Sequence, residues 1–167
     1  LTEVWNGTNW TEQGDLGTSR RALAGTTSGG STTGLAFGGE GPPLATAAES
    51  WTGAGAPAGV FSTANSMNTA RSNVGSSNAG TQTASIVFAG LAPSPTAIAE
   101  SYNGTNWTEV NDLNTARSYV SGVGTSTAAL CIGGYVGPPG NVQNVEQWNG
   151  TSWTEVSDLN TNGKQSS

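Results

Sequence analysis

The chain of 167 residues lacks histidine and has one cysteine and one lysine. Zinc clusters, Ser/His or Cys/His nucleophile pairs and intramolecular disulfides all need histidine or a second thiol, so the composition excludes them. No stretch approaches the roughly 18 unbroken apolar residues of a membrane helix, so we expect no membrane span. The formal net charge of −6 repels phosphate backbones, so nucleic acid is not expected as a partner.

The abundant residues are small and uncharged. Glycine occurs 25 times, threonine 23 times and serine 19 times, whereas hydrophobic residues make up 34% of the chain and charged residues 10%. This composition departs from that of an average globular protein and favours strands and turns over helices. The length fits one domain with a core of its own, which we place at 1–167.

Four segments of the chain are copies of one another. EVWNGTNWTE begins at Glu3 and returns as ESYNGTNWTE at Glu100 and as EQWNGTSWTE at Glu146, and ESWTGAG at Glu49 opens a degraded copy. A run around an arginine recurs with them, as SRRALAG, ARSNVG and ARSYVSG, and each is followed by a short apolar run, as GLAFGG, SIVFAG and ALCIGG. A regular period of this length is the signature of a repeat architecture.

Each copy divides into four short segments separated by turn residues, which predicts four strands per module and an all-β fold. The first segment follows the arginine, and the second ends on a glycine pair such as Gly133 and Gly134. The third carries a glutamate and an aromatic residue, and the fourth begins at a second aromatic residue. We predict a structural role for the repeated positions, which are Trp5, Trp10, Trp51, Phe61, Tyr102, Trp107, Trp148, Trp153, Arg20, Arg71, Arg117, Glu49, Glu100 and Glu146.

Four strands per module, a glycine pair after the second, and aromatic residues in the third and fourth resemble the kelch repeat. The clearest copy is ARSYVSGVGTSTAALCIGGYVGPPGNVQNVEQWNGTSWTEV. The resemblance covers almost the whole chain and looks most like the Asn-Gly-Thr-Trp variety met in bacterial, phage and environmental proteins. It implies a kelch-like β-propeller, in which each module is one four-stranded antiparallel blade and the first strands line a central channel. The middle copy departs from the pattern, because Ala89 replaces the first glycine of the pair.

The number of modules predicts a propeller that does not close within this chain. We expect a half blade at 1–14, blades at 15–60, 61–110 and 111–157, and a tail at 158–167 in which Gly163 occupies the position of the next arginine. Three and a half blades are fewer than the roughly four to eight of known propellers. The open edges and aromatic faces at both ends are therefore expected to associate, with other copies or with the rest of a longer chain.

The six tryptophans and the glycine pairs each admit a functional interpretation. Tryptophans can form a carbohydrate platform and glycine-rich loops can cradle phosphate, but both features follow the repeat. We therefore expect most of the tryptophans to pack between blades. We expect the glycine pairs to allow positive φ and close approach of neighbouring blades. Cys131 occupies the position of Ala36 and Val87 in the other modules, which predicts a small buried apolar residue instead of a reactive thiol.

Asn-Gly pairs lie between the third and fourth segments and predict type I′ hairpin turns. The asparagines of these turns also begin N-x-T sequons, which accept N-linked sugar in a suitable host. Turn chemistry accounts for three of the five sequon asparagines without any sugar. The candidate glycosylation residues are Asn6, Asn9, Asn103, Asn106 and Asn149.

Nearly all charged residues fall on repeat positions, so few remain for catalysis. Only Arg21, Glu40 and Lys164 are not periodic, and we expect them to lie in different modules. A general acid–base pair needs converging groups with displaced pKa values, so we predict no enzymatic activity, no metal site and no cofactor. We expect each periodic arginine to form an ion pair with a third-segment glutamate, within a blade or between blades.

Proline-rich stretches follow the second segment of each module. Proline stiffens a connection and cannot extend a sheet edge, and these loops differ most between the modules. We predict that they form the surface that binds partners. The candidate residues of these loops are Glu40, Pro42, Pro43, Pro93, Pro95, Tyr135, Pro138 and Pro139.

These features favour a non-catalytic scaffold outside a cell, a structural or adhesion protein of a virion or cell surface that presents loops to glycans or proteins. The scarcity of lysine, the Thr/Ser/Asn-rich composition and the kelch resemblance support the extracellular or virion location. Two alternatives stay open, an intracellular kelch-type interaction module and the non-catalytic part of a galactose-oxidase-like enzyme. The copper site of the latter needs histidine and tyrosine ligands, and this chain has no histidine.

Overall fold

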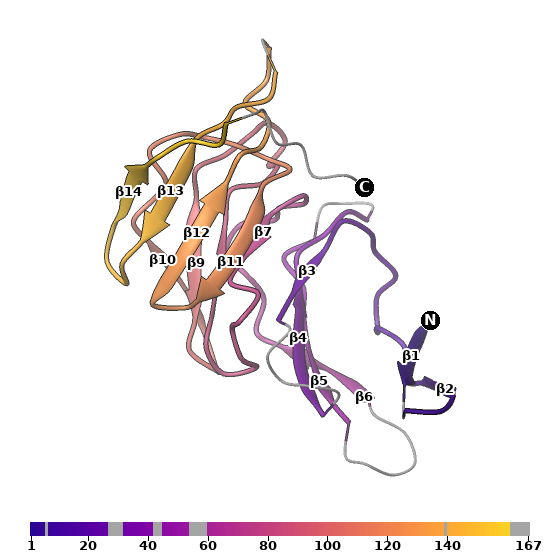
Figure 1. Cartoon of the computed structure of the whole chain (residues 1–167). Helices are drawn as coiled ribbons and strands as arrows, with labels where there is room; N and C mark the ends of the chain where they lie inside the picture. The colour runs from indigo at the N-terminus through magenta and orange to yellow at the C-terminus, as the bar shows by residue number, and fades with distance from the viewer. Residues whose placement is uncertain (6, 27–31, 42–44, 54–59, 139, 161–167) are drawn as a thin grey trace.

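The computed structural model describes residues 1–5, 7–26, 32–41, 45–53, 60–138 and 140–160 (Figure 1). Fourteen β-strands and no helix lie within these ranges. Twelve strands form three four-stranded antiparallel sheets, and the other two form a hairpin at the N-terminal end of the chain. The expected all-β fold of about three and a half blades, without a closed sheet in this part of the chain, is confirmed.

The strands of each sheet follow one another in chain order. Blade 1 contains β3 (Ala24–Gly25), β4 (Thr33–Phe37), β5 (Ala48–Thr52) and β6 (Val60–Ala64). Blade 2 contains β7 (Gly75–Ser76), β8 (Ser85–Phe88), β9 (Ala99–Tyr102) and β10 (Trp107–Val110). Blade 3 contains β11 (Ser121–Thr125), β12 (Ala128–Ile132), β13 (Val145–Trp148) and β14 (Trp153–Val156). The hairpin of β1 (Thr2–Trp5) and β2 (Trp10–Gln13), which we call the half blade, lies beside blade 1 (Figure 1).

Strand β6 places the boundary between the first two blades later than the sequence suggested. It pairs with β5 along its whole length, from Thr52 with Val60 to Ala48 with Ala64. The expected range 15–60 therefore ends inside this sheet, and the range 61–110 begins inside it. The reason is the long connection before β6, which shifts the fourth strand of this module toward the C-terminus.

Aromatic and aliphatic side chains fill the space between neighbouring blades. Phe37 of blade 1 meets Trp107 of blade 2 with ring centroids 5.0 Å apart and ring planes at 66°. Phe88 of blade 2 meets Trp153 of blade 3 in the same way, at 4.8 Å and 68°. Edge-to-face pairs of this geometry add to the free energy of apolar burial. All four side chains are buried, so the expected packing of aromatic residues between blades is confirmed at both internal contacts.

The half blade is the exception to this packing. Trp5 and Trp10 contact each other at 5.5 Å, but they are 48% and 64% exposed, whereas their counterparts Trp148 and Trp153 are 2% and 6% exposed. The four tryptophans of the complete blades are buried, as expected for most of the six, and this pair departs from that pattern. The physical reason is that no preceding sheet covers the half blade in the described structure.

The hairpins at the Asn-Gly pairs differ from the type I′ prediction. Tyr102 pairs with Trp107, so the connection has four residues and not two. Gly104 has a φ of +94°, while Asn103 is not among the residues with positive φ, and a type I′ turn requires positive φ at both central positions. The Asn103 side chain instead accepts hydrogen bonds from the backbone N–H groups of Thr105 and Asn106, at 3.0 and 2.8 Å. This side-chain cap stabilises a longer loop.

The glycine pairs join neighbouring blades through the backbone. Gly39 has a φ of +107° and its N–H donates to the Arg71 carbonyl of the next blade at 2.9 Å. A Cβ atom on Gly38 would lie 2.9 Å from the same carbonyl oxygen. The expected positive φ and close approach are thus confirmed, and Ala89 keeps the conformation with a φ of +60° where the middle module lacks the first glycine.

A second set of backbone contacts was not predictable from composition. Ala22, Asn73 and Tyr119 are equivalent residues of the three modules, and all have φ between 51° and 53°. The Asn73 N–H donates to the Ala22 carbonyl at 3.2 Å, and the Tyr119 N–H donates to the Asn73 carbonyl at 3.0 Å. Non-glycine residues seldom adopt this conformation, so these inter-blade hydrogen bonds help to hold it.

The two environments of tryptophan predict different effects of one substitution. Trp107→Ala removes a buried ring between blades and is expected to lower the free energy of unfolding by about 3–5 kcal/mol. Trp10→Ala removes an exposed ring and is expected to cost about 1 kcal/mol or less. Urea denaturation at low protein concentration measures both values. Equal losses in the two variants would contradict the described packing.

Candidate functional site

The buried charges of blade 3 form one connected unit. Arg117 precedes β11, and its Nη2 donates to Oε1 of Glu146 on β13 at 2.7 Å. Its Nη1 donates to the carbonyl oxygens of Gly133 and Asn144 at 3.0 and 2.6 Å. The Glu146 carboxylate also accepts from the backbone N–H of Asn114 at 2.7 Å. The arginine and the glutamate together thus hold the segment between blades 2 and 3 against blade 3.

Blade 2 repeats this unit with the same geometry. Arg71 Nη2 lies 2.7 Å from Glu100 Oε1, and both side chains are fully buried. Arg71 Nη1 donates to the carbonyls of Ala89 and Ile98 at 3.1 and 2.6 Å. Burial lowers the pKa of Arg71, and the adjacent Glu100 carboxylate opposes this shift. The carbonyls and the carboxylate together compensate the loss of water around the guanidinium.

Blade 1 has a looser version of the same contact. Arg20 Nη1 lies 3.1 Å from Glu49 Oε1, and Gly17 donates its backbone N–H to Glu49 Oε2 at 2.7 Å. The guanidinium of Arg20 makes no hydrogen bond within the described part of the chain. The expected ion pairs are therefore present in all three complete blades, and each lies within one blade.

The backbone donors to the glutamates were missed in the sequence analysis. Thr69 and Thr115 donate their N–H groups to Glu100 and Glu146, each at 3.3 Å. Their signal is the recurrence of Asn-Thr-Ala-Arg before blades 2 and 3, because the spacing brings two N–H groups and the arginine to one carboxylate. These charges serve the architecture and are not accessible to a substrate.

Two of the non-periodic charges converge at the surface. Arg21 Nε donates to Glu40 Oε2 at 2.7 Å, and the two side chains are 82% and 43% exposed. The backbones of the two residues also pair, with N to O distances of 3.0 and 2.6 Å. The expectation that they lie in different modules is wrong, because both fall in the range 15–60 of one module. The segment before β3 and the segment after β4 meet at one end of blade 1.

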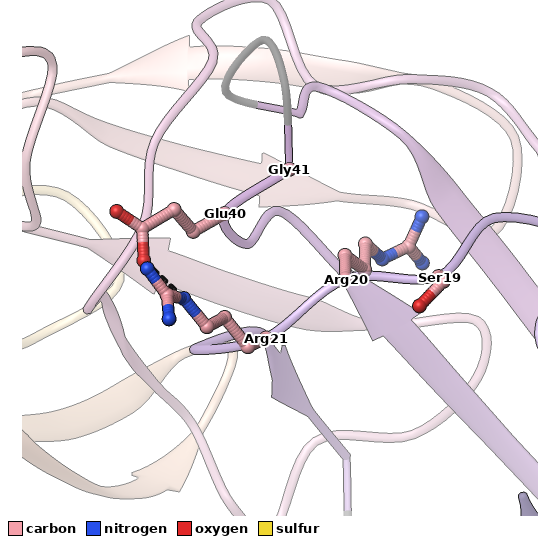
Figure 2. A pocket seen from close by; sticks show the side chains of 5 residues that line it. All are labelled: Ser19, Arg20, Arg21, Glu40 and Gly41. Atoms are coloured by element: carbon pink, nitrogen blue, oxygen red, sulfur yellow. Dashed lines mark hydrogen bonds and ion pairs between the residues drawn. The ribbon is translucent and has the colours of Figure 1, made fainter.

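A cavity of about 520 Å³ lies at this pair and is lined by Ser19, Arg20, Arg21, Glu40 and Gly41. Figure 2 shows Arg21 and Glu40 pointing toward each other, whereas the Arg20 side chain extends away from them. The exposed guanidinium offers donors and the carboxylate offers acceptors in one place. This arrangement suits a polar ligand that presents both kinds of group.

The other loop candidates occupy the equivalent connections of blades 2 and 3. Leu91 and Tyr135 pair with Ser72 and Ser118 as Glu40 pairs with Arg21, so the three connections share one end of the blades, which we call the loop face. Pro93 and Pro138 are exposed, and Pro95 and Tyr135 are half-buried. Pro42, Pro43, Pro139 and Lys164 lie outside the described residues.

The sequon asparagines have mainly structural contacts. Asn149 accepts hydrogen bonds from the N–H groups of Thr151 and Ser152, both at 2.9 Å, as Asn103 does in blade 2. Asn106 Oδ1 accepts from Asn65 Nδ2 of blade 1 at 2.9 Å, a contact between blades. The turn explanation is thus confirmed for Asn103 and Asn149. Asn9 is exposed, Asn6 lies outside the described residues, and glycosylation stays a prediction.

Cys131 is fully buried in the apolar cluster between blades 2 and 3, as expected for its repeat position. Burial raises the pKa of its thiol to about 12. No group of three or more His, Cys, Asp or Glu side chains that could hold a metal ion occurs in the described ranges. The same ranges contain no helix of the length and apolarity needed to cross a membrane.

Comparison with known proteins shows the fold. No protein-family model matches the chain, and no curated protein matches it. Among solved structures, that of YjhT is similar with a TM-score of 0.70 at 14% identity, over 89% of this chain and 49% of that chain. The chain therefore spans about half the length of YjhT, and the likeness supports a propeller-like fold.

Loss of the buried ion pair is expected to destabilise the protein strongly. Arg117→Gln leaves Glu146 charged and buried without its cation, which costs about 3–5 kcal/mol of unfolding free energy. Arg21→Gln breaks an exposed pair and is expected to leave stability almost unchanged. Urea denaturation of the two variants compares the costs. An Arg117→Gln variant as stable as the wild type would show that the pair does not hold the blade.

The raised pKa of Cys131 predicts protection from alkylation. Only the thiolate reacts, and a pKa of about 12 leaves almost none at pH 8. Iodoacetamide at pH 8 is therefore expected to label the folded chain far more slowly than the chain in urea, where the pKa returns to about 8.5. Mass spectrometry measures the labelled fraction, and equal rates in the two states would contradict the buried position.

Proposed function

We propose that this chain is a non-catalytic scaffold of the kelch-repeat kind, located outside a cell or on a virion, which presents its loop face to glycans or proteins. The observation that carries the proposal is the division of its charges. The repeated arginines and third-strand glutamates form buried ion pairs with each other, whereas Arg21 and Glu40 form an exposed pair on the loop face.

The buried charges argue against catalysis in the described part of the chain. A catalytic acid or base must reach a substrate, and Glu100 and Glu146 are fully buried and bonded to arginine and to backbone N–H groups. Arg21 and Glu40 are accessible, but the two side chains bind each other in one exposed ion pair. Binding is the simpler use of such a pair.

The chemistry of the loop face fits carbohydrate hydroxyls. A guanidinium donates and a carboxylate accepts, so the pair can bind two neighbouring hydroxyl groups in a fixed orientation. Ser19 and the backbone around Gly41 add polar groups to the same cavity. Loops supported by rigid sheets are a common location of binding sites, and Arg21 and Glu40 lie in the segments that flank β3 and β4 of the blade 1 sheet.

The open faces support the second part of the proposed role, association with further blades. The half blade pairs only through β1 and β2, whereas the third strand of each complete blade has neighbours on both sides. An unpaired strand edge and exposed aromatic rings favour association. The added blades come from other copies or from the rest of a longer chain.

An array of immobilised neutral and acidic glycans tests the binding role. The labelled wild-type chain is expected to bind a subset of glycans, and the double variant Arg21→Ala/Glu40→Ala to bind them at least about tenfold more weakly, as when one good polar contact is lost. Glu109→Ala removes an exposed charge from β10 and serves as the control. Absence of glycan binding, or equal binding by the double variant, would contradict a carbohydrate ligand at this cavity.

A further inference from the structure

The internal contacts show which surfaces of a blade fit each other. Each blade turns its third- and fourth-strand aromatic residues, which form its aromatic face, toward the preceding blade. It turns alternate second-strand residues toward the following blade. We call this surface its aliphatic face, because these second-strand side chains are aliphatic except for Phe37 in blade 1 and Phe88 in blade 2. Phe37 therefore meets Trp107, and Phe88 meets Trp153. The same pairing of an aromatic face with an aliphatic face occurs twice in one chain.

One aromatic face is uncovered in the described structure. It belongs to the half blade and consists of Trp5 and Trp10, 48% and 64% exposed. The equivalent Tyr102 and Trp107 are each 6% exposed because blade 1 covers them. The two exposed rings keep the mutual contact seen in the other blades, at 5.5 Å against 4.9 Å for Tyr102 and Trp107. The face is formed, and no residue of the described ranges covers it.

One aliphatic face is also uncovered among the described residues, on blade 3. Val123 is 37% exposed on β11, whereas the equivalent Ser77 of blade 2 is fully buried. Ile132 is half-buried, whereas Phe88 at the same position of β8 is fully buried. The side chain of Val156 on β14 is also 36% exposed. Blade 3 thus exposes aliphatic side chains at positions that are covered by the following blade in blades 1 and 2.

The geometry points to head-to-tail association of two copies, in which the Trp5 and Trp10 face of one copy packs on the aliphatic face of blade 3 of the other. Trp10 would contact Ile132 as Trp107 contacts Phe37. A second copy is the occupant favoured here because this chain itself shows the two faces in contact, twice, between its own blades. The inference deepens the scaffold role proposed above and is independent of glycan binding.

The two faces in this contact are different surfaces, so the contact is heterologous. Each added copy leaves one aromatic face and one aliphatic face free, and the assembly either closes into a ring or continues as a stack. A contact between two identical faces would end at a dimer. This difference makes the orientation of the contact measurable.

Sedimentation velocity over a range of concentrations tests the contact with the full 167-residue chain. The wild type is expected to associate, with a blue shift of tryptophan emission as Trp5 and Trp10 lose water. Trp5→Ala/Trp10→Ala and Ile132→Asp are each expected to weaken association by roughly 30-fold or more, the effect of losing a central anchor. Thr108→Asp places the same charge on an exposed outer strand of blade 2 and is expected to have no effect. Val123→Asp replaces Ile132→Asp if the latter lowers the Tm.

Mixing the two defective variants decides the orientation. Trp5→Ala/Trp10→Ala keeps its aliphatic face and Ile132→Asp keeps its aromatic face, so an equimolar mixture is expected to form a heterodimer and to stop there. A wild-type chain that stays monomeric, or a mixture that fails to pair while both variants are folded, would overturn the inference. Glycan binding by a monomeric chain would leave the loop-face role intact and reject only this contact.

Discussion

The contact between an aromatic face and an aliphatic face is the interaction on which the rest of the structure depends. A four-stranded blade has two faces, and a chain with 34% hydrophobic residues cannot form a separate core for each blade. The core is shared instead, because each internal contact buries side chains of two blades at once. The aromatic residues at these contacts are Phe37, Phe88, Trp107 and Trp153. Strand β8 is accordingly buried along its whole length, and the exposed rings of the half blade show what the face looks like without a neighbour.

The buried arginines determine where the next blade begins. Arg71 and Arg117 each bind a third-strand glutamate and two carbonyl oxygens of their own blade. The carbonyl oxygen of Arg71 also accepts the N–H of Gly39 from blade 1, and that of Arg117 accepts the N–H of Gly90 from blade 2. One residue therefore connects the inside of a blade to the blade before it. This use of charge explains how a chain with few charged residues places its buried ones so regularly, and why the surface pair of Arg21 and Glu40 stands apart.

Periodicity predicted what is repeated, and it failed where one copy differs from the others. The strands, the ion pairs and the buried Cys131 follow from residues that recur, because equivalent positions have equivalent surroundings. Trp5 and Trp10 match the buried pair of Trp148 and Trp153 in residue type but have no covering blade among the described residues, so their exposure depends on position in the stack. The convergence of Arg21 and Glu40 depends on the pairing of two segments 19 residues apart, which the repeat pattern does not specify. The capped turn recurs at Asn103 and Asn149, and its type depends on φ angles that the pattern of residues does not specify.

Hydrogen exchange of the backbone amides, at a dilution where the chain is monomeric, tests the central claim most directly. If blades are stabilised by their neighbours, amides of β8 and β9 in the middle blade exchange slowest, and those of β1 and β2 exchange fastest although they form a regular hairpin. The Gly39 and Gly90 amides, which bond to the next blade, should be protected to the same degree as those of β8. Equal protection of the half blade and the middle blade would show that each sheet is stable by itself and would contradict the account.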